Sequence, residues 1–228
     1  MRKGTAMKRS LKEWGIRVGI LLAGLAVAHL GVTLFLLSDL GSDPFNVLIQ
    51  GLFRTLQRVT GWGVLTHGRV HMAVSLVIIG VLLAVDRSYV KIGTVLCMAF
   101  GGPIIDFYTW ILNPLFGEGT GLPVRIGMLV AGCVILAYGM TIVIRSDAGT
   151  GPNDLVAVVI SDKIRKPFSI IRVLVDAAFV VAGFLLGGLV GAGTLVCVVL
   201  VGPVAGWFLP VNGRLVERIL TAAGIKTE

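Results

Sequence analysis

Two short polar phrases in this sequence carry residue types that bind solutes or ions. The first is SDLGSDPFN, residues 38–46, and the second is SDAGTGPND, residues 146–154. Each mixes carboxylates with hydroxyl or amide side chains and contains a glycine and a proline that interrupt regular backbone. Such side chains either only cap the start of a helix or also face a solute or an ion, and the residue types leave both interpretations open.

The candidate site residues come mainly from these phrases. The candidate solute-binding residues are Ser42, Asp43, Asn46, Thr150, Asn153 and Asp154. The candidate carboxylates for ion or proton coupling are Asp39, Asp147 and, from a later apolar run, Asp106. The helix-breaking residues are Gly41, Pro44, Gly149 and Pro152. Because glycine permits a sharp bend and proline suits the first turn of a helix, each phrase is expected to bring a helix N-terminus into the protein interior.

The sequence contains no motif for catalysis, metal binding or cofactor binding. It has no P-loop, no HExxH, no GxSxG and no cluster of His and Cys, and it holds three His in all. Cys97, Cys133 and Cys197 lie in apolar runs and are expected to be packing residues. We therefore expect no enzyme, no metal and no cofactor. A membrane enzyme acting on lipid-linked substrates is the weakest alternative.

The composition is that of an integral membrane protein. Of the 228 residues, 56% are hydrophobic and 14% are charged, and the mean hydropathy is +0.94. Soluble domains of this size are not so apolar, and the alternating pattern of membrane strands is missing. The expected fold class is all-α, a polytopic bundle of transmembrane helices in a lipid bilayer. The net charge of +8 comes from basic residues in short loops and termini, which indicates membrane topology rather than binding to nucleic acid.

The chain reads as an internal duplication. With a shift of 108 positions, residues 17–46 align on 125–154 without a gap, and 11 of the 30 positions are identical. Arg69 and Gly80 recur later as Arg172 and Gly183, and residues 93–103 recur as 193–203. Arg, Asp, Gly and Pro in the same order are not expected from chance similarity between two apolar segments. The sequence therefore predicts two tandem repeats in one membrane bundle.

Each repeat is expected to hold about four helical elements. They cover residues 16–37, 45–58, 70–86 and 93–112, and then 126–145, 153–164, 170–187 and 193–210. The corresponding segments are a basic cytoplasmic N-terminal segment (1–15), a first membrane repeat (16–112), a linker (113–125), a second membrane repeat (126–212) and a cytoplasmic tail (213–228).

The second element of each repeat is short and broken. Its apolar part of about 12 residues spans ~18 Å, whereas a bilayer core measures roughly 30 Å. Eight elements that all cross give parallel repeats, and re-entrant second elements give six spans and inverted repeats. We favour the parallel arrangement, because only it places the basic residues near 54–58 and 163–166 together on the cytoplasmic side. Both arrangements place the two termini in the cytoplasm.

Other charged residues in or beside the apolar runs have ordinary explanations. Arg17, Arg69, Arg125 and Arg172 begin spans and are expected to reach to the membrane interface. Asp176 follows Arg172 by four positions, so an ion pair on one helix face is expected. His29 is expected to be a packing histidine. Asp106 has no such local partner.

The stretches GSDPFNVL near residue 41 and GTGPNDLV near residue 149, with the length and the basic N-terminus, resemble the YczE/YyaS/YitT-type family of bacterial integral membrane proteins. The resemblance covers most of the chain. It implies a multi-pass protein of the bacterial cytoplasmic (inner) membrane, and it supplies no functional residues to carry over.

The leading hypothesis is a permease for a small polar or charged solute, with a central site formed by the two phrases. The alternative is a non-transporting membrane scaffold or regulatory protein that acts through a partner. A homo-oligomer is left open. Solvent access at the two phrases discriminates between the two hypotheses.

Overall fold

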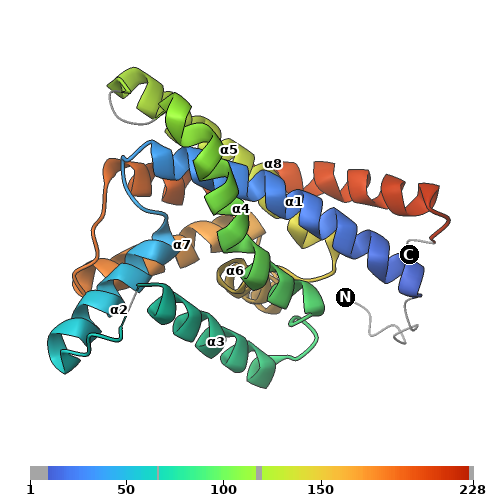
Figure 1. Ribbon diagram of the computed structural model, residues 1–228. Coiled ribbons are helices and arrows are strands. Elements are labelled where there is room, and N and C mark those ends of the chain that lie inside the picture. The colour runs from blue at the N-terminus through green and yellow to red at the C-terminus, as the bar shows by residue number, and fades with distance from the viewer. Residues whose placement is uncertain (1–9, 66, 117–119, 226–228) are drawn as a thin grey trace.

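The computed structural model describes residues 10–65, 67–116 and 120–225, and this part of the chain forms eight α-helices and no strand (Figure 1). The helices are α1 (Leu11–Leu37), α2 (Pro44–Thr60), α3 (His67–Val85), α4 (Ile92–Phe116), α5 (Leu122–Ser146), α6 (Pro152–Ile164), α7 (Phe168–Leu185) and α8 (Ala192–Ala222). The predicted all-α fold is confirmed. Parts of the predicted N-terminal segment, linker and tail lie outside the described residues.

Six helices are long and apolar enough to cross a membrane, namely α1, α3, α4, α5, α7 and α8. The other two are α2, with 17 residues, and α6, with 13 residues. At about 1.5 Å per residue these helices measure about 26 and 20 Å, less than the roughly 30 Å of a bilayer core. The structure therefore does not support the eight-span arrangement that the basic clusters favoured.

The most extensive helix contact joins α1 and α5, which cross in antiparallel directions. Ala28 faces Gly139, and Gly31 faces Gly132 and Leu136, so residue numbers rise along α1 while they fall along α5. A Cβ atom on Gly139 would overlap the backbone of Ala28, and one on Gly31 would overlap the backbone of Leu136. Small residues at these positions let the two backbones touch, which is a common basis of helix packing in membranes.

Two further spans extend this central pair. Helix α8 packs along α5 through Cys133, Cys197 and Val201, while α4 packs along α1 through Leu25 and Cys97. The three cysteines are free and buried, so their predicted packing role is confirmed.

The start of α1 and the end of α8 lie at the same end of the bundle (Figure 1). Lys12 Nζ donates to the carbonyl oxygen of Ala223 at 2.8 Å. The two described ends of the chain therefore lie together.

The short helices α2 and α6 pack between the spans α3 and α7. Phe45 of α2 lies in a cluster with Val70 of α3 and Phe179 of α7. Leu155 of α6 packs on Leu82 of α3, and α6 also contacts α7 through Ala157, Ile171 and Val175. Both short helices therefore share the same two neighbouring spans.

Candidate functional site

The first phrase ends α1 and starts α2 as its composition predicts. Ser38 Oγ donates to the carbonyl oxygen of Phe35 at 2.6 Å. Asp39 (φ 50°) and Gly41 (φ 152°) then turn the chain through positive φ values. Asp43 is the N-cap residue of α2 and accepts from the backbone N–H of Asn46 at 3.2 Å. Asp43 therefore caps the start of α2.

The second phrase repeats this backbone path between α5 and α6. Ser146 Oγ donates to the carbonyl oxygen of Val143 at 2.6 Å. Asp147 has φ 56° and Gly149 has φ 135°, which lie in the same positive-φ range as the values at Asp39 and Gly41. Gly151 occupies the N-cap position of α6 and has no side chain that could cap the helix. The acidic residue in the first turn of this helix is Asp154.

The outer parts of the two phrases lie at opposite ends of the α1–α5 pair. Arg125, near the start of α5, donates to the carbonyl of Ser38 at 2.6 Å, whereas Arg17, near the start of α1, donates to the carbonyl of Ser146 at 3.0 Å. The helical rise from Arg17 to Ser38 is about 32 Å. One central ion site therefore cannot contain both Asp39 and Asp147.

The three predicted coupling carboxylates have different surroundings. Asp39 is 91% exposed and forms an ion pair with Arg125 at 2.9 Å. Asp147 is paired with Lys91. Asp106 lies on the exposed face of α4. The structure does not bring these carboxylates together.

The inner parts of the phrases, by contrast, approach the middle of α7. Phe45, the second residue of α2, contacts Phe179 with ring centroids 5.4 Å apart. Asp154, in the first turn of α6, pairs with Arg172 at 2.6 Å. Phe179 also packs in the cluster of α6 with Ala157. The N-terminal ends of both short helices therefore meet near the centre of one span.

A buried charge cluster occupies this meeting point. Arg172 donates through Nη1 to Asp154 at 2.6 Å and through Nε to Asp176 at 2.8 Å. Its side chain is 7% exposed, and that of Asp176 is 1% exposed. Asp43 is close enough to Asp176 for a repulsive electrostatic interaction.

The cluster corrects one expectation from sequence and confirms another. Arg172 does not reach to the membrane interface, because its guanidinium is buried between two carboxylates. The predicted contact of Arg172 with Asp176 on one helix face is confirmed, with Nε and Oδ2 2.8 Å apart. The second contact of Arg172, with Asp154, joins two different helices, α7 and α6, and the spacing of residues along one helix does not predict it.

The remaining predicted binding residues belong to the same two phrases. Asn46 donates to Asp43, and Asn153 donates to Asp154 at 3.2 Å. The carbonyl of Ser42 accepts from Thr194 Oγ1 at 2.6 Å. Thr150 is buried, and its hydroxyl has no partner among the described residues. The amides of both phrases thus bond to neighbouring carboxylates rather than standing free.

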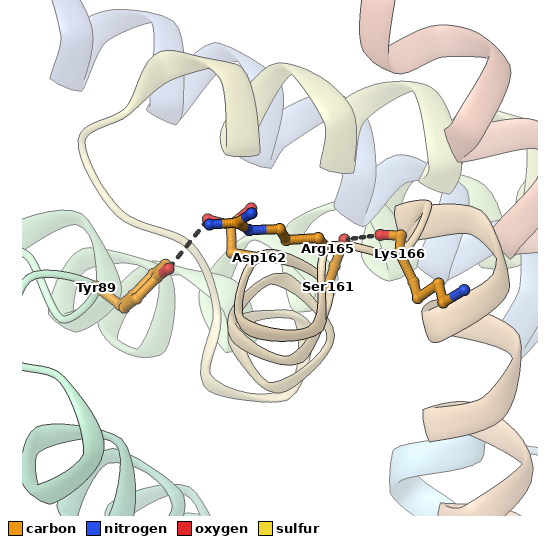
Figure 2. A pocket seen from close by; sticks show the side chains of 5 residues that line it. All are labelled: Tyr89, Ser161, Asp162, Arg165 and Lys166. Atoms are coloured by element: carbon orange, nitrogen blue, oxygen red, sulfur yellow. Dashed lines mark hydrogen bonds between the residues drawn. The ribbon is translucent and has the colours of Figure 1, made fainter. Parts of the chain in front are cut away.

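A polar pocket of about 350 Å³ lies at the far end of α6 (Figure 2). It is lined by Tyr89, Ser161, Asp162, Arg165 and Lys166. Tyr89 points across it and donates to Asp162 at 3.1 Å. We call this end of the bundle the pocket end. Tyr89 and Lys91 both lie in the connection between α3 and α4. The pocket end therefore also includes Asp147, which accepts a hydrogen bond from Lys91.

Two ionisable groups at the pocket end, Asp86 and Tyr89, have pKa values shifted from their ordinary values. Hydrogen bonds from the hydroxyl and backbone N–H of Ser88, with a further one from Lys163, lower the pKa of Asp86 to about 2. Partial burial and the nearby Asp162 carboxylate raise the pKa of Tyr89 to about 12. At neutral pH, Asp86 is therefore ionised and Tyr89 is a neutral donor.

The far end of α2, in contrast, is closed against the α7–α8 connection. A Cβ atom on Gly51 would overlap the carbonyl of Gly183, so the two helix backbones touch. Arg54 donates to the carbonyl of Gly187 at 2.8 Å, and Thr55 donates to that of Leu186 at 2.9 Å. We call this the sealed end. It includes Asp39, because the neighbouring Leu40 accepts from Gly193 at the start of α8.

Comparisons with known proteins place this chain in a family. An uncharacterised protein of Haemophilus influenzae is 28% identical over 198 residues, which cover 87% of this chain and 85% of that protein. The uncharacterised membrane protein YczE of Bacillus subtilis is 27% identical over 207 residues, covering 90% and 91%. YyaS of the same organism is 26% identical over 192 residues, covering 84% and 91%. No solved structure matches the chain significantly.

These relatives confirm the resemblance to the YczE and YyaS proteins. A family model also matches residues 15–210, which include all eight helices at least in part. The chain therefore belongs to the family of unknown function DUF6198.

Proposed function

We propose that this protein is a permease for a small polar or charged solute, and that the solute binds where α2 and α6 begin. The observation that carries the proposal is the approach of two helix N-termini to a buried charge cluster around Arg172. Broken helices that start near the bilayer midplane are a recurring construction of transporter binding sites. The proposal includes no catalytic step.

We also infer that the two halves are inverted repeats. The backbone N–H of Gly93 donates to the carbonyl of Ala148 at 2.9 Å, and that of Gly193 donates to Leu40 at 2.9 Å. The sequence repeat makes these pairs equivalent. The antiparallel crossing of α1 and α5 supports a symmetry axis in the membrane plane, because two repeats in parallel would run these helices in the same direction.

The two halves differ at one contact that suits alternating access. Gly183 of α7 is packed against the backbone of Val47, so α2 is closed on α7. Its repeat equivalent is Gly80 of α3, which has open space at the same position. A movement of α3 onto α6 would close the pocket end by the packing that now closes the sealed end.

Ligand-dependent stability tests the proposal with many candidate solutes in one assay. The purified protein is heated with a panel of small polar metabolites, amines, organic acids and inorganic ions. A solute at about 100 times its dissociation constant is expected to stabilise the protein by about 2.7 kcal/mol. Asp154→Asn should abolish that shift, and the matched control Asp162→Asn on the same helix should keep it.

Uptake of the stabilising solute into proteoliposomes completes the test. Stabilisation that is lost in Asp154→Asn, together with uptake, supports the permease. A panel without any stabilising or transported solute contradicts it.

The alternative function, a scaffold that acts through a partner, is favoured by one observation. Asp106 lies on the exposed face of α4 beside exposed Phe107 and Trp110. A carboxylate that faces lipid is costly, and a partner helix with a donor would lower that cost. The scaffold predicts that Asp106→Leu dissociates a stoichiometric complex in mild detergent. The permease predicts that this variant still takes up solute.

A further inference from the structure

The buried cluster has more negative than positive charge. Arg172 faces two carboxylates, Asp154 and Asp176, with one guanidinium. With both acids ionised the triad would carry a net charge of −1 inside the bundle. Asp43, at the start of α2, adds a third carboxylate that acts on Asp176. Excess charge away from water is unstable unless another positive charge balances it.

One oxygen of Asp176 is left without a donor. Oδ2 accepts from Arg172, but Oδ1 is buried and has no hydrogen-bond partner among the described residues. An ionised carboxylate has about four acceptor sites, and burying it with few of them filled is costly. The groups that face Asp176 include Arg172, Asp154, Asp43 and the thiol of Cys197 on α8. Arg172 is the cation among them.

A metal ion does not suit this position. Within residues 10–65, 67–116 and 120–225, no three His, Cys, Asp or Glu side chains are arranged to hold one. One positive charge is needed to neutralise the triad, and the atom without a partner is a single oxygen, Oδ1 of Asp176. A proton supplies it with no further ligand.

We propose that Asp176 carries a proton in this conformation, as an O–H bond at Oδ1. With Asp176 protonated, the positive charge of Arg172 is balanced by Asp154 alone, and the triad of these three residues becomes neutral. No electron moves, and the proton returns to water when the cluster becomes hydrated. The inference rests on the proposed function in one respect, since it names the ion that a central transport site would exchange.

The sequence adds that the site occurs once in each chain. The repeat equivalents of Arg172, Asp154 and Asp176 are Arg69, Asn46 and Ala73. The first half therefore has the arginine without either of the two carboxylates. One protonated buried carboxyl per chain is expected.

Infrared spectroscopy of the full-length protein in lipid tests this assignment. A protonated carboxyl gives a C=O stretching band that shifts in D₂O. Spectra are recorded from about pH 5 to about pH 8, where an ordinary exposed Asp is ionised. The wild type should show such a band. Asp176→Asn should remove it, Asp176→Glu should move it because a carboxyl is retained, and Asp162→Asn at the pocket should leave it unchanged.

Each outcome decides the assignment. No band in the wild type at any of these pH values would overturn the proposal, since both acids would then be ionised. A band that stays unchanged in Asp176→Asn and Asp176→Glu would overturn it as well, because the proton would be on another group. The Glu variant and the wild-type spectrum keep the test decisive if the Asn variant does not fold. Solute uptake is measured in a separate assay. Uptake without the infrared band would mean that the protein is a permease without this proton, and the band without uptake would mean that the proton is present but the protein does not transport the solute.

Discussion

The side chain of Arg125 donates hydrogen bonds to both the backbone carbonyl and the carboxylate of Asp39. Nη2 of Arg125 lies 2.6 Å from the carbonyl oxygen of Asp39 and 2.9 Å from its Oδ2 atom, while Nε donates to Ser38. These carbonyls follow the last turn of α1, where intrahelical donors have run out. The arginine of one antiparallel helix therefore stabilises the end of the other.

Loss of this contact should destabilise the fold. Arg125→Ala leaves the carbonyls of Ser38 and Asp39 without their charged donor, and we expect a loss of about 1–3 kcal/mol. Arg125→Lys should recover only part, because an ammonium cannot span both acceptors. Thermal unfolding in detergent measures the change. Arg214→Ala is the control, since that side chain bonds within its own helix. Equal melting temperatures for the Arg125→Ala and Arg214→Ala variants would contradict the assigned role.

The glycine contact between α1 and α5 predicts a second, larger effect. Gly139→Val places side-chain atoms on the backbone of Ala28, so the two helices must separate. Overpacking of this kind costs about 1–3 kcal/mol, and more where a backbone must move. Gly127→Val on the same helix meets nothing within 4 Å and is the matched control. The melting temperature should fall for the first variant alone. A stable Gly139→Val protein would mean that the helices do not cross there.

The difference between Gly183 and Gly80 gives a third prediction. Gly183→Val pushes α7 off the backbone of Val47 and should lower the melting temperature. Gly80→Val meets open space in this conformation and should leave that temperature unchanged. It should nevertheless slow solute uptake, because the added methyl groups prevent α3 from closing on α6. Uptake at the wild-type rate by Gly80→Val would show that this closure is not required.

The pocket end should keep its contacts across the physiological pH range. Asp86 has a pKa of about 2 when folded, against an ordinary value of 3.8, so its contribution is present above the ordinary value and is lost as pH falls through about 2. Tyr89 stays protonated until about pH 12 and keeps its bond to Asp162. Carboxyl ¹³C NMR of labelled Asp, assigned with Asp86→Asn, measures the titration. A midpoint at or above the ordinary value would contradict the hydrogen bonds from Ser88.

Much of the architecture could be predicted from local sequence. Gly41, Pro44, Gly149 and Pro152 placed the breaks between helices correctly, because positive φ and helix starts depend on single residue types. The apolar runs predicted the helices to within a few residues at most ends. At α8 the forecast stopped at residue 210, but the helix continues through Pro210 to Ala222.

The candidate site was only partly predictable, since it depends on contacts distant in the chain. The motif supplied Asp154, yet its partner Arg172 was expected at the interface, where arginines at span ends commonly lie. The direction of α5 relative to α1 could not be predicted from the sequence either. Similarity between two segments is the same whether they cross the membrane in parallel or in opposite directions. That direction separates Asp39 from Asp147 and leaves the inner residues of the two phrases as the meeting point.

The most direct test of the account is sided thiol labelling at the starts of α2 and α6. In a protein with Cys97, Cys133 and Cys197 replaced by Ala, single cysteines at Asn46 and Asn153 are treated with a membrane-impermeant reagent. The reagent is added to right-side-out and to inverted vesicles. Cysteines at Asp39 and Asp86 are controls for the two surfaces, and each should react from one side only.

The account predicts that both central cysteines react from both sides, and that the solute slows the reaction. Central cysteines that react from neither side in a folded protein would contradict a transport site at this position.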